Sequence, residues 1–124
     1  MTDLLIVAHG SRREASNEEI RQLAAQLGSY DSAFAQISCG FLEIASPSIP
    51  EALLAMIANG SQSIVVMPYF LSAGRHVSTD IPAEIAQVQT QAPEIEIRLA
   101  PYLGAAEQIA SLLLQQASLG LIKS

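Results

Sequence analysis

The two histidines of this 124-residue chain each follow a strongly apolar segment and stand beside arginine. His9 comes directly after residues 4–8, and His76 follows the apolar run of residues 64–71 by a short polar loop. Imidazole is the commonest metal ligand and the commonest general base near neutral pH. Three of the six cationic residues flank these histidines in a chain of net charge −6, namely Arg12, Arg13 and Arg75. This pattern indicates an anionic substrate beside a metal site or a proton-transfer site.

The order of the strands decides which loops meet, because α/β proteins carry their chemistry in the loops after parallel strands. Residues 4–8 and 64–71 are unbroken apolar runs, which is typical of central strands covered on both faces. Residues 36–41 and 94–99 alternate apolar and polar side chains, which predicts strands nearer the sheet edges. Helical patterns lie between and after these strands, at residues 20–27, 48–58, 81–88 and 109–114.

This alternation of strands and helices, with short connections, predicts an α/β fold with one parallel sheet, helices on both faces and right-handed crossovers. With the apolar strands in the centre, the expected strand order is 2-1-3-4, a flavodoxin-like winding shortened by one strand. We expect residues 1–124 to form one domain, since their number is close to the commonest domain size. The order brings His9, His76 and Glu43, which follows the second strand, to one crevice at the carboxyl ends of adjacent strands.

Two imidazoles and one carboxylate suit a divalent first-row metal such as iron, cobalt, nickel or zinc. Three protein ligands leave coordination positions open, as a site that accepts and releases a metal requires. Without a metal, the same groups could take protons from a substrate N–H.

Each candidate residue also has an ordinary structural explanation. Either histidine can cap a loop or lie at the surface, and Glu43 can lie near the start of the following helix, where the helix dipole favours negative charge. Arg12 and Arg13 can be first-turn surface residues. Cations are unfavourable at a helix N-terminus, however, and this mildly favours an anionic ligand beside them.

The composition excludes several classes of function. The acidic balance and the absence of a basic tract argue against nucleic acid as a partner. The single cysteine, Cys39, lies in a strand pattern, so we expect an inert core residue in a reducing compartment. Without a signal peptide or an apolar run long enough to cross a bilayer, the chain is expected to be cytoplasmic and to bind no membrane. Nucleotide-binding, nucleophile-elbow and C-x-x-C motifs are absent.

Three segments resemble the signature segments of the class II tetrapyrrole chelatases, and most closely the short CbiX/SirB type, the sirohydrochlorin chelatases. They are residues 7–12 (VAHGSR), 40–43 (GFLE) and 68–82 (PYFLSAGRHVSTDIP). The resemblance covers essentially the whole chain. It implies insertion of Co²⁺, Fe²⁺ or Ni²⁺ into sirohydrochlorin, on the route to cobalamin, sirohaem or coenzyme F430. It also implies that the metal is a substrate and that no cofactor is permanently bound.

By the same resemblance, His9 and His76 handle the metal and Glu43 is the carboxylate that assists them. Sirohydrochlorin is a polycarboxylate, so the arginines are expected to pair with its acidic side chains. Glycines in the two loops are expected to let the macrocycle approach the backbone. The residues expected to bind the substrate are Gly10, Ser11, Arg12, Arg13, Ser72, Gly74 and Arg75.

The long members of this family hold two such domains in one chain, so the resemblance implies a homodimer with a cleft between two copies. A tetrapyrrole is a broad disc, and ligand sites enclose most of their ligand, which one four-stranded domain cannot do alone. Residues 109–114 and 119–122 offer more apolar surface than one amphipathic face needs. We expect part of that surface to form the interface.

Two other functions stay open. A carrier with the same fold would bind metal or tetrapyrrole without turnover. A hydrolase-like or phosphate-transferring domain would use His9, but an arginine normally precedes such a histidine, and Ala8 stands there. The metal itself is not decided by these ligands, because affinities for iron, cobalt and nickel follow one common trend.

Overall fold

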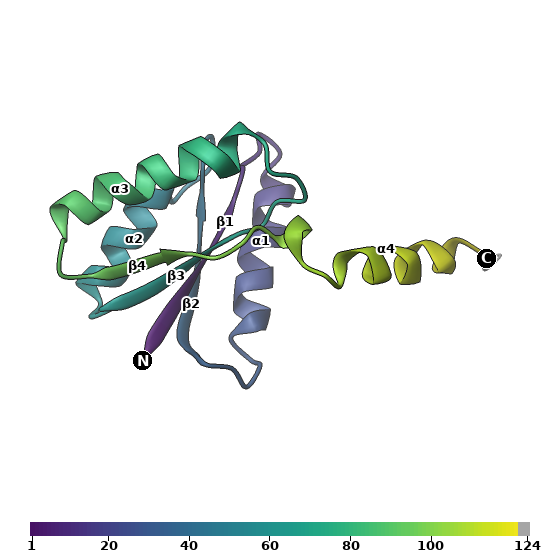
Figure 1. Cartoon of the computed structure of the whole chain (residues 1–124), viewed down its shortest axis with the longest axis horizontal. Coiled ribbons are helices and arrows are strands. Elements are labelled where there is room, and N and C mark those ends of the chain that lie inside the picture. The colour runs from purple at the N-terminus through teal and green to yellow at the C-terminus, as the bar shows by residue number, and fades with distance from the viewer. Residues whose placement is uncertain (122–124) are drawn as a thin grey trace.

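Four parallel strands form one sheet in the order β2-β1-β3-β4, which confirms the predicted strand order. The computed structural model describes residues 1–121 (Figure 1). β1 pairs with β2 on one side and with β3 on the other, so β1 and β3 are central. The strands are β1 (Thr2–Ala8), β2 (Phe34–Phe41), β3 (Ser63–Pro68) and β4 (Glu96–Leu99).

Helices lie on both faces of the sheet, as expected (Figure 1). The α-helix that follows β1 packs along β2, while the two that follow β2 and β3 pack against each other. A π-helical turn and two short 3₁₀ helices complete the structure. The helices are α1 (Glu14–Leu27), α2 (Ile49–Ala58), η1 (His76–Asp80), α3 (Ile81–Gln91), η2 (Leu103–Ala105), α4 (Ile109–Ser118) and η3 (Leu119–Leu121).

The main hydrophobic core lies between the sheet and the helices α2 and α3. Leu5 and Val7 of β1 are fully buried in it, together with Ile64 and Val66 of β3. Their spacing of two residues places them on the same face of the sheet. The two central strands are therefore anchored by packing along their length, and their carboxyl ends have a fixed relative position.

The capping box predicted from residues 48–51 is present at the start of α2. The Ser48 hydroxyl accepts a hydrogen bond from the Glu51 backbone N–H at 3.2 Å, and the Glu51 carboxylate accepts one from the Ser48 N–H at 2.8 Å. These hydrogen bonds lower the pKa of Glu51 below its usual value. The box fixes where the loop after β2 ends.

Two predicted strands were too long. The third strand was expected over residues 64–71 but ends at Pro68, because its neighbour β1 ends at Ala8 and offers few further partners. The Tyr69 N–H still donates to Val7 O at 2.8 Å, after which the chain leaves the sheet and Phe70 packs against the core. The fourth strand begins at Glu96 rather than at residue 94.

Two further expectations need correction. His76 was expected in a loop, but it opens the π-helical turn η1, which continues directly into α3. Cys39 was expected in the core, but it is only half-buried on β2, where partial burial raises the pKa of its thiol.

The fourth predicted helix is present as α4, but none of its residues is buried, and it extends away from the sheet (Figure 1). Ile122, the last residue of the apolar run expected at 119–122, lies outside the described residues. Among residues 1–121, no helix has the length and apolar character needed to span a membrane.

Candidate metal and substrate site

The backbone brings His9 and Glu43 together at the carboxyl edge of the sheet. The Leu42 N–H donates to Ala8 O at 2.9 Å, and the Glu43 N–H donates to His9 O at 3.0 Å. These bonds continue the pairing of β1 and β2 past the ends of both strands. His76 comes from the segment after β3, the other neighbour of β1. The topology thus gathers residues that the chain separates widely, as predicted.

The three side chains form a compact cluster. His9 Nε2 lies 2.8 Å from Glu43 Oε1, and the rings of His9 and His76 meet edge to face with centroids 4.7 Å apart. One ligand atom from each residue lies within 4.8 Å of the others. About half of each side chain is exposed, 44% for His9, 52% for Glu43 and 43% for His76. Such a cluster can accept a metal ion from solvent without a rearrangement of the core.

Hydrogen bonds at the Nδ1 atoms set which nitrogen of each histidine can bind a metal. His76 Nδ1 lies 2.8 Å from Asp80 Oδ2, and His9 Nδ1 lies 3.0 Å from Gly10 O. Both partners are acceptors, so each Nδ1 carries the proton and donates it. That leaves Nε2 as the nitrogen available to a metal; at His9 it faces the cluster, where it shares a proton with Glu43 Oε1 at 2.8 Å. This arrangement of acceptor, histidine and metal recurs in protein metal sites.

Asp80 is a functional candidate that was not singled out from the sequence, although it lies in the signature segment of residues 68–82. It lies four residues after His76 in the π-helical turn, so both side chains project from one side of that turn. The signal was available in the sequence as a carboxylate at i+4 from a histidine, directly before a proline-containing helix start.

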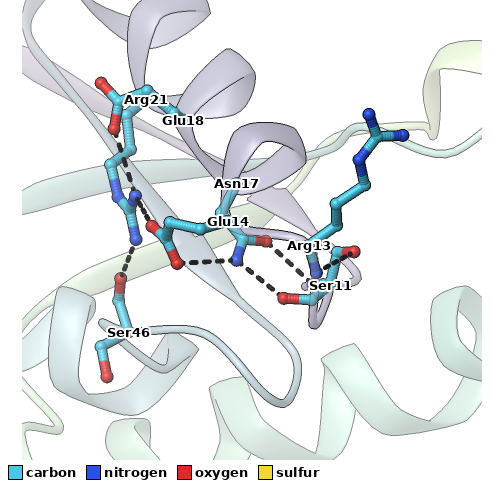
Figure 2. Close-up of polar contacts among 7 residues, drawn as sticks. All are labelled: Ser11, Arg13, Glu14, Asn17, Glu18, Arg21 and Ser46. Carbon is cyan, nitrogen blue, oxygen red and sulfur yellow. Dashed lines mark hydrogen bonds and ion pairs between the residues drawn. The ribbon is translucent and has the colours of Figure 1, made fainter.

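Two side chains of α1 tether the loops that carry His9 and Glu43 (Figure 2). Asn17, which is 2% exposed, accepts from the Ser11 N–H at 2.8 Å and donates to Ser11 O at 2.8 Å. Arg21 pairs with Glu14 and Glu18 and donates to Ser46 O at 3.2 Å. The Arg21 guanidinium lowers the pKa of Glu14. Neither Asn17 nor Arg21 was singled out from the sequence, because no local sequence pattern shows that a helix residue will hydrogen-bond to a loop elsewhere in the chain.

The loop after β1 needs a glycine at position 10, because there it passes close to the backbone of the loop after β2. Its φ is +94°, and a Cβ there would lie 1.8 Å from the carbonyl oxygen of Glu43. Gly10 was expected to make room for an approaching macrocycle, whereas the structure shows the close approach of the Glu43 backbone. At Gly74 a Cβ would meet no atom within 4 Å, so its neighbours do not demand a glycine.

The remaining substrate-binding candidates lie in the two segments that carry His9 and His76. Ser72 and Arg75 are exposed in the segment between β3 and η1, and Arg12 and Arg13 are exposed directly before α1. None of these three arginines forms an ion pair within residues 1–121. Ser11 is less free, because its hydroxyl accepts from the Arg13 N–H at 3.0 Å.

A pocket of about 280 Å³ adjoins the cluster. It is lined by Leu42, Glu43, His76, Asp80, Ala83 and Glu84. Burial, and then the charge of Asp80, raise the pKa of Glu84, whose Oε2 is buried without a hydrogen-bond partner in this part of the chain. The pocket has room for an ion and its water molecules, whereas pockets for drug-sized ligands span about 300–1,000 Å³.

A protein-family model decides the relationship of this chain to known proteins, since the model for CbiX matches residues 3–118. The chain belongs to the CbiX family. This assignment confirms the resemblance drawn from the three signature segments.

Curated members similar to this CbiX-family chain are sirohydrochlorin cobaltochelatases. The protein of Sulfurisphaera tokodaii is 33% identical over 113 residues, which are 91% of this chain and 88% of that protein. The protein of Sulfolobus acidocaldarius is 32% identical over 117 residues, 94% of this chain and 90% of that one.

Solved structures of CbiX and SirB proteins have the same fold. The putative cobalamin biosynthesis CbiX protein of Marinobacter aquaeolei superposes with a TM-score of 0.83 at 25% identity, over 98% of both chains. The sirohydrochlorin chelatase SirB of Bacillus subtilis subspecies spizizenii, in complex with cobalt, gives 0.84 at 27% identity over 94% of this chain. This chain spans 50% of that SirB chain.

Proposed function

We propose that this chain is a metal chelatase that inserts a divalent metal into sirohydrochlorin, with Co²⁺ or Fe²⁺ as the expected metal and Ni²⁺ as a further candidate. The observation that carries the proposal is the convergence of His9, Glu43 and His76, with ligand atoms within 4.8 Å, at the carboxyl edge of the sheet. Membership of the CbiX family and the similarity to sirohydrochlorin cobaltochelatases support sirohydrochlorin as the acceptor.

The first step of the proposed reaction is capture of the metal ion by the cluster. In the free protein, His9 Nε2 and Glu43 Oε1 are in contact at 2.8 Å. An arriving divalent ion displaces the proton that these two atoms share, which passes to water, and binds Nε2 of His9 and an oxygen of Glu43. The Nε2 of His76 completes a three-ligand site. The ligands are half-exposed and only three, so solvent and substrate can fill the other coordination positions. This favours transfer of the metal over permanent retention.

In the second step, the metal passes to the pyrrole nitrogens of sirohydrochlorin and replaces their protons. Each pyrrole N–H that the metal replaces must lose its proton to a base within hydrogen-bond reach. Glu43 is suited to this role, because metal transfer frees its carboxylate while its exposed half lets the proton pass to water. A histidine freed in the same step can serve as a second acceptor. The proposed catalytic and metal-binding residues are therefore the same three.

Substrate binding is assigned to the exposed arginines. Arg12, Arg13 and Arg75 flank the two histidines and have no acidic partner among residues 1–121. Their guanidinium groups can form paired, charge-assisted hydrogen bonds with carboxylates at the rim of the macrocycle. They offset the repulsion that a chain of net charge −6 exerts on a polyanion.

The active form is proposed to be a homodimer located in the cytoplasm. The dimer is supported by the small volume of the pocket beside the cluster, which leaves one face of a disc-shaped substrate uncovered. The location is supported by the single cysteine, which suits a reducing compartment.

Anaerobic metallation under multiple-turnover conditions tests the proposed activity. Sirohydrochlorin in large excess over protein is offered Co²⁺, Fe²⁺ or Ni²⁺ separately, and the absorbance of the macrocycle is followed. We expect many equivalents of metallated product per chain, at a rate proportional to protein concentration and above the uncatalysed rate. One equivalent of bound metal or tetrapyrrole without turnover would instead establish a carrier.

A further inference from the structure

We infer that the side chain of Ile44 is an apolar contact for the macrocycle of the substrate, and that the loop after β2 presents it beside the metal cluster. Ile44 directly follows Glu43 and was not among the residues assigned from the sequence. The inference rests on the proposed function, because it takes sirohydrochlorin as the ligand. It follows from two properties of Ile44, its backbone conformation and its exposure.

The backbone at Ile44 has a conformation that isoleucine disfavours. Its φ is +72°, and it is the one residue other than glycine with a positive φ among residues 1–121. The Ala45 N–H donates to Glu43 O at 2.7 Å, which closes a ring around Ile44. A hydrogen bond between residues i and i+2 around a positive φ makes a γ-turn of the rare, strained kind. Branching at Cβ makes a positive φ still less favourable, so glycine or asparagine would be the ordinary residue at this position.

Hydrogen bonds on both sides hold this γ-turn in place. Before it, the Glu43 N–H donates to His9 O at 3.0 Å. After it, Arg21 donates to Ser46 O at 3.2 Å (Figure 2). Backbone strain persists only where the surrounding structure over-determines it, and strained residues gather at functional sites. The γ-turn therefore has a defined position relative to His9 and Glu43 before a substrate binds.

Packing within the described part of the chain does not account for an isoleucine at this position. Leu42, two residues earlier, packs against the hydrophobic core, whereas Ile44 is 59% exposed. A single exposed apolar residue is ordinary. An exposed isoleucine in a strained turn is different, because glycine would relieve the strain with little loss of buried surface. Ile44 thus lowers the stability of the free protein, and a ligand that covers its side chain gives a reason for its presence.

The ligand that suits Ile44 has an apolar face close to the nitrogens that accept the metal. The three clustered side chains and the exposed arginines are polar or charged, whereas ligand sites are lined mainly by apolar side chains with a few polar groups that fix orientation. A tetrapyrrole combines a conjugated, apolar macrocycle with carboxylates at its rim. Adjacent Cα atoms lie about 3.8 Å apart, so a macrocycle that presents a pyrrole N–H to Glu43 is broad enough to cover Ile44.

Substitution by asparagine separates the apolar contact from the shape of the turn. Asparagine tolerates a positive φ, so Ile44→Asn should keep the γ-turn and be at least as stable as the wild type in denaturant melts. We expect its Kd for sirohydrochlorin, titrated by absorbance without metal, to rise about tenfold, because the exposed part of an aliphatic side chain no longer gains from burial. The control is Tyr30→Asn, which removes a side chain of similar exposure, 62%, four residues before β2 begins. Its Kd should be unchanged.

Three further measurements distinguish a substrate contact from a structural role. The affinity of the protein alone for Co²⁺ should be the same in Ile44→Asn and in the wild type, because isoleucine offers no ligand atom. Ile44→Leu restores an apolar side chain and should keep the wild-type Kd for sirohydrochlorin. Ile44→Gly should have an unfolding equilibrium constant about fivefold smaller than that of Ile44→Ala, since alanine keeps the strain of a positive φ. Both of these variants should lose as much sirohydrochlorin affinity as Ile44→Asn does.

Wild-type sirohydrochlorin affinity in Ile44→Asn or Ile44→Gly would overturn the inference. An equal loss of Co²⁺ affinity in these variants would also overturn it, because Ile44 would then act by positioning Glu43.

The same titrations separate this inference from the proposed function. A wild-type chain that metallates sirohydrochlorin, with an equal Kd in Ile44→Asn, contradicts the inference and leaves the proposed activity intact. A wild-type chain that binds sirohydrochlorin without metallating it, with weaker binding in Ile44→Asn, supports the inference and contradicts the proposed activity.

Discussion

At the scale of single residues, the chemistry of this site depends on which nitrogen of each histidine faces the metal position. Asp80 and the Gly10 carbonyl accept from the two Nδ1 atoms and leave Nε2 as the nitrogen that we propose binds the metal. A metal-binding histidine without such an acceptor samples both tautomers and more ring orientations. The carboxylate of Asp80 is therefore a positioning group for His76, although it does not belong to the three-ligand cluster.

Replacing Asp80 by Asn tests that role. The amide keeps the size of the side chain but removes the charge that favours the Nδ1–H tautomer. We expect Co²⁺ to bind and react about 10- to 100-fold less well. The KM for sirohydrochlorin should stay unchanged, because Asp80 is not assigned to substrate binding. Asp31→Asn, which removes an equal charge from an exposed loop, is the control. Equal metal affinity in the two variants would show that Asp80 does not position His76.

Gly10 allows a second residue-scale prediction, because Gly60 shares its unusual backbone conformation. Gly10 has φ +94° and Gly60 has φ +104°, but a Cβ at Gly60 meets no atom within 4 Å. Gly60→Ala should therefore cost only the backbone strain, about 1 kcal/mol. Gly10→Ala adds the collision with the Glu43 carbonyl, and we expect a loss of ~3 kcal/mol or more in the free energy of unfolding. Denaturant melts of both variants measure the difference, and equal losses would contradict the collision.

At the scale of elements, α1 is more than a cover for the sheet. Its residues Asn17 and Arg21 hold the two loops that carry His9 and Glu43 (Figure 2). The site is therefore supported by a helix that contributes none of the three clustered side chains. This explains how a half-exposed cluster can keep a defined geometry before metal arrives.

Asn17→Ala tests the support by α1. The substitution leaves the N–H and the carbonyl of Ser11 without their side-chain partner, so we expect a loss of about 1–3 kcal/mol in the free energy of unfolding. The looser His9 loop should also lower kcat for metallation even at temperatures where the variant is fully folded. Ser16→Ala, a change on the same helix turn outside this hydrogen-bond network, is the control. A variant with wild-type stability and full activity would show that the His9 loop keeps its conformation without the hydrogen bonds from Asn17.

The elements also show what the sequence can and cannot predict. Strand order and the meeting of His9, Glu43 and His76 followed from hydrophobic patterns, because central parallel strands have no polar face. The end of β3 could not be predicted, because the apolar run continues beyond the last paired residue. Tyr69 makes one more hydrogen bond to β1, and Phe70 packs against the core outside the sheet. The π-helical turn at His76 and the tethers from Asn17 and Arg21 depend on tertiary contacts that leave no local pattern.

At the scale of the whole molecule, charge opposes the proposed reaction. The chain carries a net charge of −6, and its proposed substrate is a polyanion. The exposed arginines that flank the histidines in the sequence are expected to attract the substrate against this background. Their contribution should therefore depend on ionic strength, because exposed charges are screened by salt.

Arg75→Ala tests the role of this attraction. If Arg75 holds a carboxylate of the substrate equally well throughout the reaction, its loss should raise the KM for sirohydrochlorin and leave kcat nearly unchanged. We expect a rise of about tenfold at low salt, which corresponds to one exposed charge-assisted pair, and a smaller rise at high salt. Arg98→Ala removes an arginine that pairs with Glu96 on β4, and serves as the control. A fall in kcat alone would instead place Arg75 in the chemical step.

The central claim is that His9 and His76, delivered by neighbouring strands, make one metal-inserting site. The most direct test is the initial rate of anaerobic Co²⁺ insertion into sirohydrochlorin by the wild-type chain and by the His9→Ala/His76→Ala double variant, with circular dichroism to verify folding. We predict that the folded double variant reacts no faster than the uncatalysed mixture. A double variant that retains the wild-type rate would contradict the claim.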